Sequence, residues 1–275
     1  MLSEARVFLS LVVPVYNCES WIVSRIAEVL EYLDERPEIC ELIIVDDGSS
    51  DATGSRLAEF IAHRSGVTLI RLPRNVGKGG AVRQGMRETR GRYCVFTDCD
   101  LAYPLTEIDT LLERLIGGAD VVIANRRATN SVAEVRTATL EQANRRERNG
   151  RILNNVLRRL GLTRVEDTQA GLKGFRREAV HIFEYLTVTR FAFDIELLVI
   201  AAEQGFTIES VPVRYRLADD PSTVNAVRDG LQLSLSALQI ARNRSLGVYL
   251  LDSLAAHRRR MVITPGVAMP RRKVG

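Results

Sequence analysis

The 275-residue sequence lacks several features that would place it in a specialised class of protein. It contains only four cysteines, without the spacing of a metal site, and we therefore expect free thiols in a cytosolic protein rather than a disulfide framework. No signal peptide and no apolar run long enough to span a membrane are present. Basic residues are not interleaved with aromatic ones, which argues against a nucleic-acid-binding platform.

What is present is the composition of an ordinary globular protein, with 46% hydrophobic and 26% charged residues. A chain of this size can form one substantial core and an appendage. We expect a catalytic domain over residues 1–220 and a C-terminal region of amphipathic helices and a basic tail over residues 221–275. The formal net charge of +4 is modest, but the basic residues are clustered, which favours an anionic partner. Charge alone leaves phosphate, lipid and nucleic acid open.

Short apolar segments alternate with amphipathic ones through the first half of the chain. We predict strands over Val7 to Val13, Glu41 to Val45, Val67 to Leu72, Arg92 to Thr97 and Ala119 to Ile123, and helices over Glu19 to Leu33, Thr53 to His63, the 75–80 segment to Arg87, and Thr106 to Ile116. This alternation predicts an α/β fold with a doubly wound, mostly parallel sheet. Ligands of such sheets bind at the carboxyl ends of the strands.

The second half of the chain is less regular. A polar segment from Ala128 to Arg148 has little apolar periodicity, which in a compact domain is typical of mobile or functional segments. A basic helix is predicted over Gly150 to Leu160, and a longer amphipathic helix over Val224 to Arg242. Phe206 to Tyr215 is predicted to be a strand, and Pro212 within it indicates a sheet edge or a bulge.

The predicted strand that ends at Thr97 is followed by two acids, Asp98 and Asp100. Two neighbouring carboxylates repel each other unless a positive group lies between them, and a divalent cation that holds a diphosphate fits this position. The alternative is that both acids only cap the helix that begins near Thr106, since Asp is common in loops and caps.

Glycines surround Lys78 at the start of the third predicted helix. Gly77, Gly79 and Gly80 permit close approach of another backbone or ligand, but they lack the spacing of a dinucleotide-binding motif, and a Walker-type loop is absent. Lys78 either lies near phosphates or is a solvated residue at a helix start, where a cation is locally unfavourable.

Four segments at predicted strand ends together resemble the nucleotide-sugar glycosyltransferases of family 2, which have the GT-A fold. They are Val13-Pro14-Val15-Tyr16-Asn17, Ile44-Val45-Asp46-Asp47-Gly48-Ser49-Ser50-Asp51, Arg74-Asn75-Val76-Gly77-Lys78-Gly79 and Asp98-Cys99-Asp100. The resemblance implies that the following residues bind the donor: Pro14, Tyr16 and Asn17 beside the nucleoside, Asp46 or Asp47 at the uracil or ribose, Gly77 and Lys78 near the phosphates, Asp98 on the nucleotide side, and Asp100 at a Mg²⁺ or Mn²⁺ ion. A carboxylate suits ribose hydroxyls and an imide N–H because both donate hydrogen bonds to it.

Later segments resemble the branch of this family that uses polyprenyl phosphates, especially the dolichyl-phosphate glucosyltransferases. They are Asn125-Arg126-Arg127, the run from Glu166 to Arg177, Phe193-Asp194-Ile195-Glu196-Leu197-Leu198 and Val211-Pro212-Val213-Arg214-Tyr215. The resemblance implies an inverting, metal-dependent enzyme of glycan or cell-envelope biosynthesis that moves a hexose, with glucose favoured, from a UDP-sugar to a lipid phosphate. Arg126 and Arg127 would then neutralise the acceptor phosphate, unless they belong to a solvated basic loop.

The acceptor decides the chemistry. A phosphate monoester is already anionic and needs no general base, whereas a soluble hydroxyl acceptor, the alternative, would need one, and Asp167 is the candidate. Asp167 could equally be a turn residue. We expect Gln169 to bind sugar hydroxyls, and we expect one of Asp194 and Glu196 to face the substrate while the other faces water.

Two departures from the family pattern affect these expectations. Ala102 stands where some relatives have a polar residue, so water would complete the coordination of the metal, and Cys99 should point away from it. The C-terminal region, with His257-Arg258-Arg259-Arg260, predicts either peripheral attachment to the cytoplasmic face of a membrane or a disordered tail. An inactive nucleotide-sugar-binding module is a further alternative, against which the presence of Asp98, Asp100 and Asp167 argues. The donor base, the sugar and the oligomeric state are left open.

Overall fold

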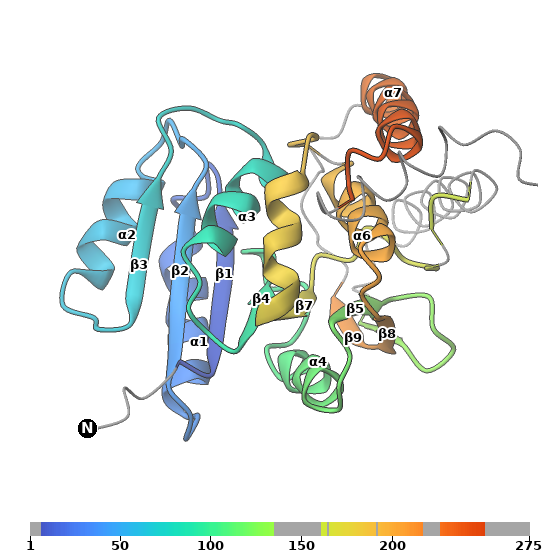
Figure 1. Cartoon of the computed structure of the whole chain (residues 1–275). Coiled ribbons are helices and arrows are strands. Elements are labelled where there is room, and N and C mark those ends of the chain that lie inside the picture. The colour runs from blue at the N-terminus through green and yellow to red at the C-terminus, as the bar shows by residue number, and fades with distance from the viewer. Residues whose placement is uncertain (1–6, 135–160, 164, 191, 217–225, 251–275) are drawn as a thin grey trace, which may run out of the picture.

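The computed structural model (Figure 1) describes residues 7–134, 161–163, 165–190, 192–216 and 226–250, with side chains described from residue 235 in the last of these ranges. The predictions for Gly150 to Leu160 and for the basic tail beyond residue 250 lie outside the described residues, as does the part of the predicted polar segment from residue 135 to residue 148. Among the described residues, none of the helices combines the length and the apolar character needed to cross a bilayer.

The first half of the chain alternates strands and helices, as predicted. The elements are β1 (Leu9–Val15), α1 (Ile22–Asp34), β2 (Cys40–Asp46), α2 (Thr53–Ile61), β3 (Val67–Arg71), α3 (Lys78–Arg87), β4 (Tyr93–Phe96), α4 (Glu107–Ile116) and β5 (Val121–Asn125). Strands β1, β4 and β5 are buried along their whole length. This burial explains why they are continuous apolar runs, since both faces of a parallel sheet are covered.

The main sheet has seven strands in the order β3-β2-β1-β4-β7-β5-β8. Its pairs are parallel except where β7 (Lys173–Arg176) runs antiparallel between β4 and β5. Strand β1 pairs with β2 on one side and β4 on the other, so the strand order reverses there. The carboxyl ends of these three strands carry the predicted donor residues, as expected for such a switch point. The structure confirms the α/β fold class with a mostly parallel, doubly wound sheet.

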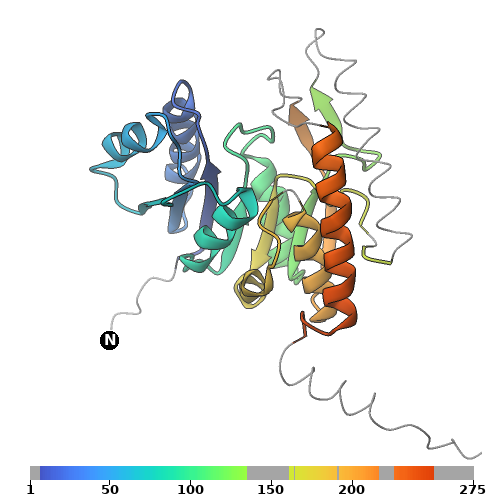
Figure 2. The ribbon, with the colours of Figure 1, turned by 90° about the horizontal axis from the view of Figure 1, so that it is seen from above.

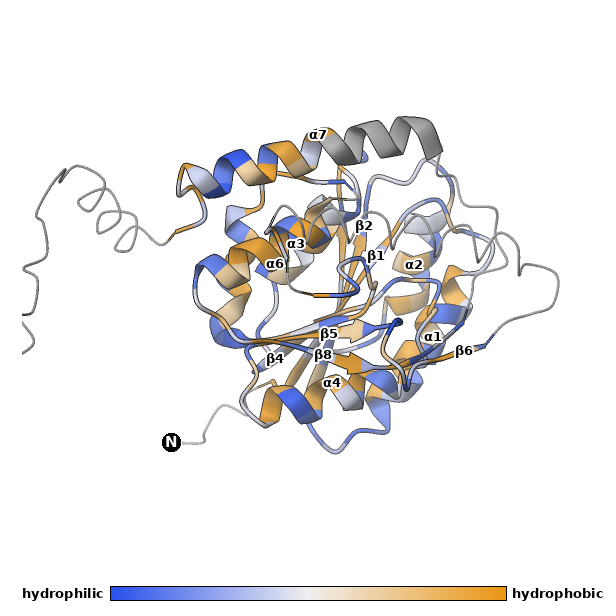
Figure 3. Cartoon of the chain, turned by 90° about the vertical axis from the view of Figure 1, so that its right-hand side faces the viewer, coloured by the Kyte–Doolittle hydropathy of each residue, from blue (hydrophilic) through white to orange (hydrophobic). Residues whose placement is uncertain are grey.

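Helices cover both faces of the sheet (Figure 3). Helices α1 to α4 each bury one side, whereas α6 (Phe193–Glu203) is buried on all sides over Phe193 to Ala201. On one face, α3 packs with the 3-10 helix η2 (Arg177–Tyr185) and with α6, and on the other face lie α1, α2 and α4. Alternation along β1 separates the two layers, because Val12 packs with the first group while Leu11 and Val13 pack with the second.

Three features of the second half differ from or refine the prediction. Strand β7 was not predicted. The predicted strand from Phe206 to Tyr215 is two strands, β8 (Ile208–Pro212) and β9 (Arg214–Arg216), and β9 pairs with β6 (Val132–Glu134) in a separate two-stranded sheet. Pro212 ends β8, which lies at the edge of the main sheet, as the proline indicated.

Helix α7 (Ala226–Ser245) includes most of the predicted helix from Val224 to Arg242. It lies along α6 (Figure 2), where Ala237 and Ile240 join the core. Tyr249, just after the helix, is also part of this core and is fully buried. The C-terminal part of the described chain is therefore integrated with the layer that contains α3 and α6.

Candidate functional site

The loops after β1 and β2 are tied together at the start of the site. The Asn17 backbone N–H donates to Ser49 Oγ at 3.0 Å, and Ser50 N–H donates to Asn17 Oδ1 at 2.9 Å. Asn17 has a φ of 46°, a left-handed conformation that Asn tolerates better than most residues. Tyr16 beside it is 47% exposed and can stack on a base, whereas Pro14 is buried within β1.

Asp46 and Asp47 are both buried, and their carboxylates hold neighbouring backbone. Asp46 accepts hydrogen bonds from Ser49 N–H at 2.9 Å and from Arg71 Nε at 3.3 Å. Asp47 accepts from the backbone N–H groups of Val76 and Gly77 at 2.8 and 2.9 Å. Burial raises the pKa of Asp47, although these N–H groups oppose the shift. Both carboxylates therefore bind groups of the protein and shape the loops around the site. The role of Asp46 or Asp47 as a nucleoside ligand stays a prediction.

The glycines near Lys78 allow tight packing within the protein. A Cβ at Gly79 would lie 2.5 Å from the Phe193 side chain, and one at Gly77 would lie 2.8 Å from the Thr189 carbonyl oxygen. Gly80 N–H donates to the same oxygen at 3.2 Å. The first turn of α3 is thus pressed against the segment that precedes α6, which fixes the position of Lys78.

Lys78 and Asp98 form an ion pair at the carboxyl ends of the strands. Lys78 Nζ lies 2.6 Å from Asp98 Oδ1. Burial lowers the pKa of Lys78, but the carboxylates of Asp98 and Asp194 outweigh it, and the net shift is upward. A Cβ at Gly171 would lie 2.0 Å from Asp98 Oδ2, so a larger residue at this position would displace the carboxylate from where it lies.

Asp100 is exposed on the turn that follows β4. Its Oδ1 accepts a hydrogen bond from Ala102 N–H at 3.0 Å, and desolvation and the nearby Asp98 raise its pKa. Within the described residues, acidic, His and Cys side chains form no cluster of three that could hold a metal ion. A cation on Asp98 and Asp100 would therefore need other ligands, and the surplus negative charge of this turn fits that arrangement.

The cysteine between these acids packs against the protein instead of toward the turn's exposed side. Cys99 is partly buried and packs against the core cluster that contains Cys18. All four cysteines are free, as predicted.

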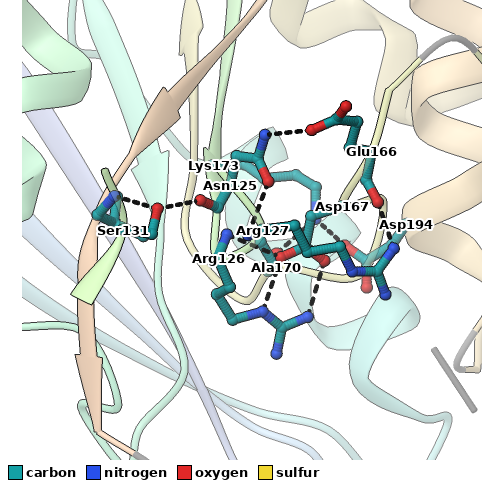
Figure 4. A network of polar contacts seen from close by, with 10 residues as sticks. Asn125, Arg126, Arg127, Ser131, Glu166, Asp167, Ala170, Lys173 and Asp194 are labelled. Atoms are coloured by element: carbon teal, nitrogen blue, oxygen red, sulfur yellow. Dashed lines mark hydrogen bonds and ion pairs between the residues drawn. The ribbon is translucent and has the colours of Figure 1, made fainter. Parts of the chain in front are cut away.

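Arg126 and Asp167 form a two-pronged ion pair after β5 (Figure 4). Arg126 donates from Nε and Nη2 to the two carboxylate oxygens at 2.7 and 2.8 Å, and its backbone N–H donates to the same carboxylate at 3.1 Å. Asp167 is fully buried, while 34% of the Arg126 side chain is exposed. Burial raises the pKa of Asp167, but Arg126 outweighs it and the net shift is downward. A carboxylate held in this way is a poor proton acceptor.

Arg127 points to the loop before β7. Its Nη1 donates to the Glu166 carbonyl oxygen, and its backbone N–H donates to Asn125 Oδ1 at 2.9 Å. Gln169 is half-buried in the same loop. The structure thus places Arg126 and Arg127 on one loop, where Arg126 binds the Asp167 carboxylate and Arg127 donates to the backbone beside it.

Asp194 and Glu196 are both buried, so the expectation that one of them faces water is wrong. Asp194 pairs with Lys173 at 2.5 Å, and Lys173 also donates to the Ala170 carbonyl oxygen at 2.6 Å. Glu196 accepts from the N–H groups of Thr187 and Val188 at 2.9 and 2.8 Å. The Tyr249 hydroxyl donates to Glu196 at 2.7 Å. Both acids therefore have partners within the protein, and a role in substrate binding stays a prediction.

Lys173 is the charged residue of this region that sequence reasoning missed. It is fully buried, and its ammonium lies 5.4 Å from the centre of the Phe96 ring. The signal available was a lysine between glycines and apolar residues in the run Gly171-Leu172-Lys173-Gly174-Phe175, because a charge in so apolar a setting needs a partner.

Comparisons with known proteins agree on the family. The model of glycosyl transferase family 2 matches residues 10–183. The dolichyl-phosphate beta-glucosyltransferase of Saccharomyces cerevisiae is 27% identical, covering 90% of this chain and 78% of that protein. The dolichyl-phosphate beta-glucosyltransferase ALG5C of Trichomonas vaginalis is 30% identical over 87% and 72% of the two chains, and the human protein of that activity is 33% identical over 75% and 67%.

Solved structures show the same fold. Glucosyl-3-phosphoglycerate synthase from Mycobacterium tuberculosis, in complex with Mn²⁺, UDP and phosphoglyceric acid, superimposes with a TM-score of 0.60 at 20% identity. The match covers 90% of this chain and 80% of that one. At this identity the likeness concerns the fold.

Proposed function

Because the chain belongs to glycosyl transferase family 2, we propose that it transfers glucose from UDP-glucose to a polyprenyl or dolichyl phosphate, with inversion at the anomeric carbon. That it is a glycosyltransferase follows from the family and from relatives with that activity. The names of these relatives support glucose and a lipid phosphate for this chain. The observation that carries the choice of acceptor is the Arg126–Asp167 pair.

A hydroxyl acceptor would need Asp167 to remove a proton. The Asp167 carboxylate is instead bound by three N–H groups of Arg126, and its pKa is lowered, so its affinity for a proton is weak. A phosphate monoester brings its own negative charge and needs no base. The partly exposed guanidinium of Arg126 would bind that charge, for which its planar set of donors is suited. The pair therefore supports a phosphate acceptor over a hydroxyl.

The reaction proposed is a single displacement. An oxygen of the acceptor phosphate attacks the anomeric carbon, the bond from that carbon to the β-phosphate oxygen breaks, and UDP leaves from the opposite face. Asp98 and Asp100 would hold a divalent cation, which would neutralise the charge that develops on the departing diphosphate. Lys78 keeps its positive charge because its pKa is raised, and it would bind a phosphate oxygen of the donor. Tyr16, Asn17, Asp46 and Asp47 would surround the nucleoside.

A lipid acceptor also implies contact with a membrane surface, and α7 supports such contact. Leu235, Leu238 and Leu246 are exposed, and Arg242 is exposed among them. Their spacing places them along one side of a helix and its continuation. Apolar side chains flanked by an arginine suit an anionic leaflet, where each basic residue contributes about 1 kcal/mol. We propose that the C-terminal region from residue 221 attaches the enzyme peripherally, at the cytoplasmic face of the membrane.

The test compares two acceptors that differ only in the phosphate. Radiolabelled UDP-glucose is offered with a polyprenyl phosphate or with the polyprenol of equal length, and with Mn²⁺, Mg²⁺ or excess EDTA. We expect transfer to the phosphate alone, loss of transfer in EDTA, and a β-glucosyl product by NMR. Equal transfer to the alcohol would contradict the phosphate acceptor. Activity in EDTA would contradict the requirement for a divalent metal, and an α-linked product would contradict inversion at the anomeric carbon.

A pair of carboxylate variants provides the control for the metal. Asp100→Ala should lower kcat/KM about 100-fold or more, because metal stabilisation of a leaving group contributes several kcal/mol. Asp34→Ala removes a carboxylate from an exposed ion pair with Arg64, remote from the site, and should leave kcat/KM unchanged.

A further inference from the structure

Tyr103 carries a polar group that the described protein leaves unused. Its side chain is 3% exposed, and its hydroxyl oxygen is buried without a hydrogen-bond partner among the described residues. An unpaired buried hydroxyl costs about 1–3 kcal/mol, so native structures keep one chiefly where a ligand or water completes it.

The other buried atoms without partners in the described chain belong to groups that are otherwise engaged. Arg83 donates from both Nη atoms to the carbonyl oxygens of Leu186 and Glu184. Arg36 and Glu38 face each other at 3.5 Å. In Tyr103, by contrast, the hydroxyl is the one polar group of the side chain, and it has no hydrogen-bond partner among the described residues.

The position of Tyr103 follows from the turn that carries the acidic pair. The Leu101 N–H bonds back to the Asp98 carbonyl oxygen at 3.1 Å, and the Ala102 carbonyl oxygen accepts from Arg216 N–H at 2.6 Å. The Tyr103 ring packs in the same core cluster as Ala170 and Leu172. These two residues flank Gly171, which touches Asp98. Tyr103 thus follows the acidic turn in the sequence and shares a core cluster with the two residues that flank Gly171, in the loop that carries Asp167.

Charged residues from both halves of the proposed site act on the hydroxyl. Burial raises the pKa of Tyr103, and Arg126, Asp167 and Asp98 are the charged groups that act on it. The Gly171 N–H also acts on the hydroxyl oxygen but does not complete a hydrogen bond. The phenol stays protonated and can only be used as a donor or a neutral acceptor at physiological pH.

The nearby carboxylates already have partners. Asp167 is bound by Arg126, and Asp98 is paired with Lys78. The Tyr103 hydroxyl therefore needs another acceptor for its hydrogen. An anion that binds to the Arg126 guanidinium would supply one. We propose that the Tyr103 hydroxyl donates a hydrogen bond to an oxygen of the acceptor phosphate, beside Arg126. This inference rests on the proposed function, and Tyr103 joins Arg126 as an acceptor-binding residue.

Tyr103→Phe tests the inference because it removes one oxygen and keeps the ring. With polyprenyl phosphate as the acceptor, the KM of the variant should rise about 10- to 150-fold, the worth of a hydrogen bond to a charged group. The KM for UDP-glucose should not change. The melting temperature of the ligand-free variant should equal or exceed that of the wild type, since the variant loses a buried unpaired group.

Tyr32→Phe is the matched control. Tyr32 lies near the C-terminal end of α1, and its hydroxyl donates to Asp109 Oδ1 at 3.0 Å and accepts from Arg36 at 2.8 Å. Its loss should lower the melting temperature and leave the KM for polyprenyl phosphate unchanged. The two tyrosine variants are therefore expected to show opposite patterns of stability and acceptor binding.

The outcomes separate this inference from the proposed function. If the wild type transfers to polyprenyl phosphate and Tyr103→Phe has the same acceptor KM, the inference is overturned and the proposed function stands. A change confined to the KM for UDP-glucose would also overturn it, because the hydroxyl would then serve the donor. Wild-type transfer to polyprenol but not to polyprenyl phosphate would overturn the proposed function and this inference together.

Discussion

Two lysine–aspartate pairs lie in neighbouring parts of the molecule and have opposite environments. Lys78 and Asp98 are 2.6 Å apart at the strand ends, and their side chains are 28% and 32% exposed. Lys173 and Asp194 are 2.5 Å apart beneath them, at 0% and 6% exposure. The first pair is accessible to a ligand, while the second is enclosed by Phe96 and the core around it.

The lysine pKa values shift in opposite directions. Burial is the largest influence on both and lowers the pKa of each. For Lys173 it outweighs the attraction of Asp194, and the net shift is downward. For Lys78 the charges of Asp98 and Asp194 together outweigh it, and the net shift is upward. Lys173 thus depends on Asp194 to remain charged. Lys78 stays protonated at neutral pH, so its ammonium can bind a phosphate.

The largest effect on stability is expected from breaking the buried pair. Lys173→Met should lower the free energy of unfolding by about 3–5 kcal/mol, because it leaves Asp194 buried without its partner. The double variant Lys173→Met, Asp194→Leu should recover to within about 2 kcal/mol of the wild type, since apolar side chains can replace a buried pair. Urea denaturation at neutral pH gives the free energy of unfolding of the wild type, the single variant and the double variant.

An exposed pair gives the comparison for that experiment. Arg87 and Glu184 form an ion pair on the surface, with side chains 41% and 46% exposed. Arg87→Met should cost less than about 1 kcal/mol. If the double variant in the core is as unstable as Lys173→Met alone, the loss does not come from an uncompensated charge.

A third pair sharpens the comparison, because only one of its members is buried. Asp167 is enclosed and Arg126 is partly exposed. Asp167→Asn should lower the free energy of unfolding by about 1.5–3 kcal/mol, the worth of hydrogen bonds to a charged group. The folded-state pKa of Asp167 lies below its unfolded value, so its contribution is present above that unfolded value and is lost as pH falls through the folded pKa.

The measurement for Asp167 is therefore a difference between two proteins at two pH values. The gap between wild type and Asp167→Asn should be full at pH 7 and should shrink below about pH 3.8, the ordinary pKa of the carboxyl group. Asp34→Asn, from the exposed pair with Arg64, should change the free energy of unfolding by less than about 0.5 kcal/mol. A gap that stays constant with pH would mean that the charge of Asp167 does not support folding.

The sequence predicted the first half of the fold well for a physical reason. Strands buried on both faces, such as β1 and β5, are continuous apolar runs that local pattern detects. Strand β7 was not predicted, because Lys173 and Gly174 interrupt any such run. Lys173 is compatible with a central strand only through Asp194, which lies 21 residues further along the chain.

The candidate site shows the same division. Motifs at strand ends were enough to predict that Asp98, Asp100 and Arg126 lie at the same edge of the sheet, because strand ends converge in a parallel sheet. The partners of these side chains depend on tertiary contacts that no local spacing encodes, as in the pairing of Arg126 with Asp167, 41 residues away. Tyr103 in Leu101-Ala102-Tyr103-Pro104 is, by pattern, an ordinary packing residue. Only the burial of its hydroxyl distinguishes it.

The smallest effect on stability is expected at the open pair, where the effect on function should be clear. Lys78→Met should change the free energy of unfolding by no more than about 1 kcal/mol, because solvent can reach Asp98 after the lysine is lost. Its affinity for UDP should fall about 10- to 100-fold, since a charged donor to phosphate is removed. Calorimetry with UDP, alongside urea denaturation, measures both quantities in one preparation. Asp98 then loses its counter-charge, so added Mn²⁺ should raise the melting temperature of Lys78→Met at least as much as that of the wild type. A large loss of stability with unchanged UDP affinity would reverse the assignment, and Lys78 would then be a structural residue like Lys173.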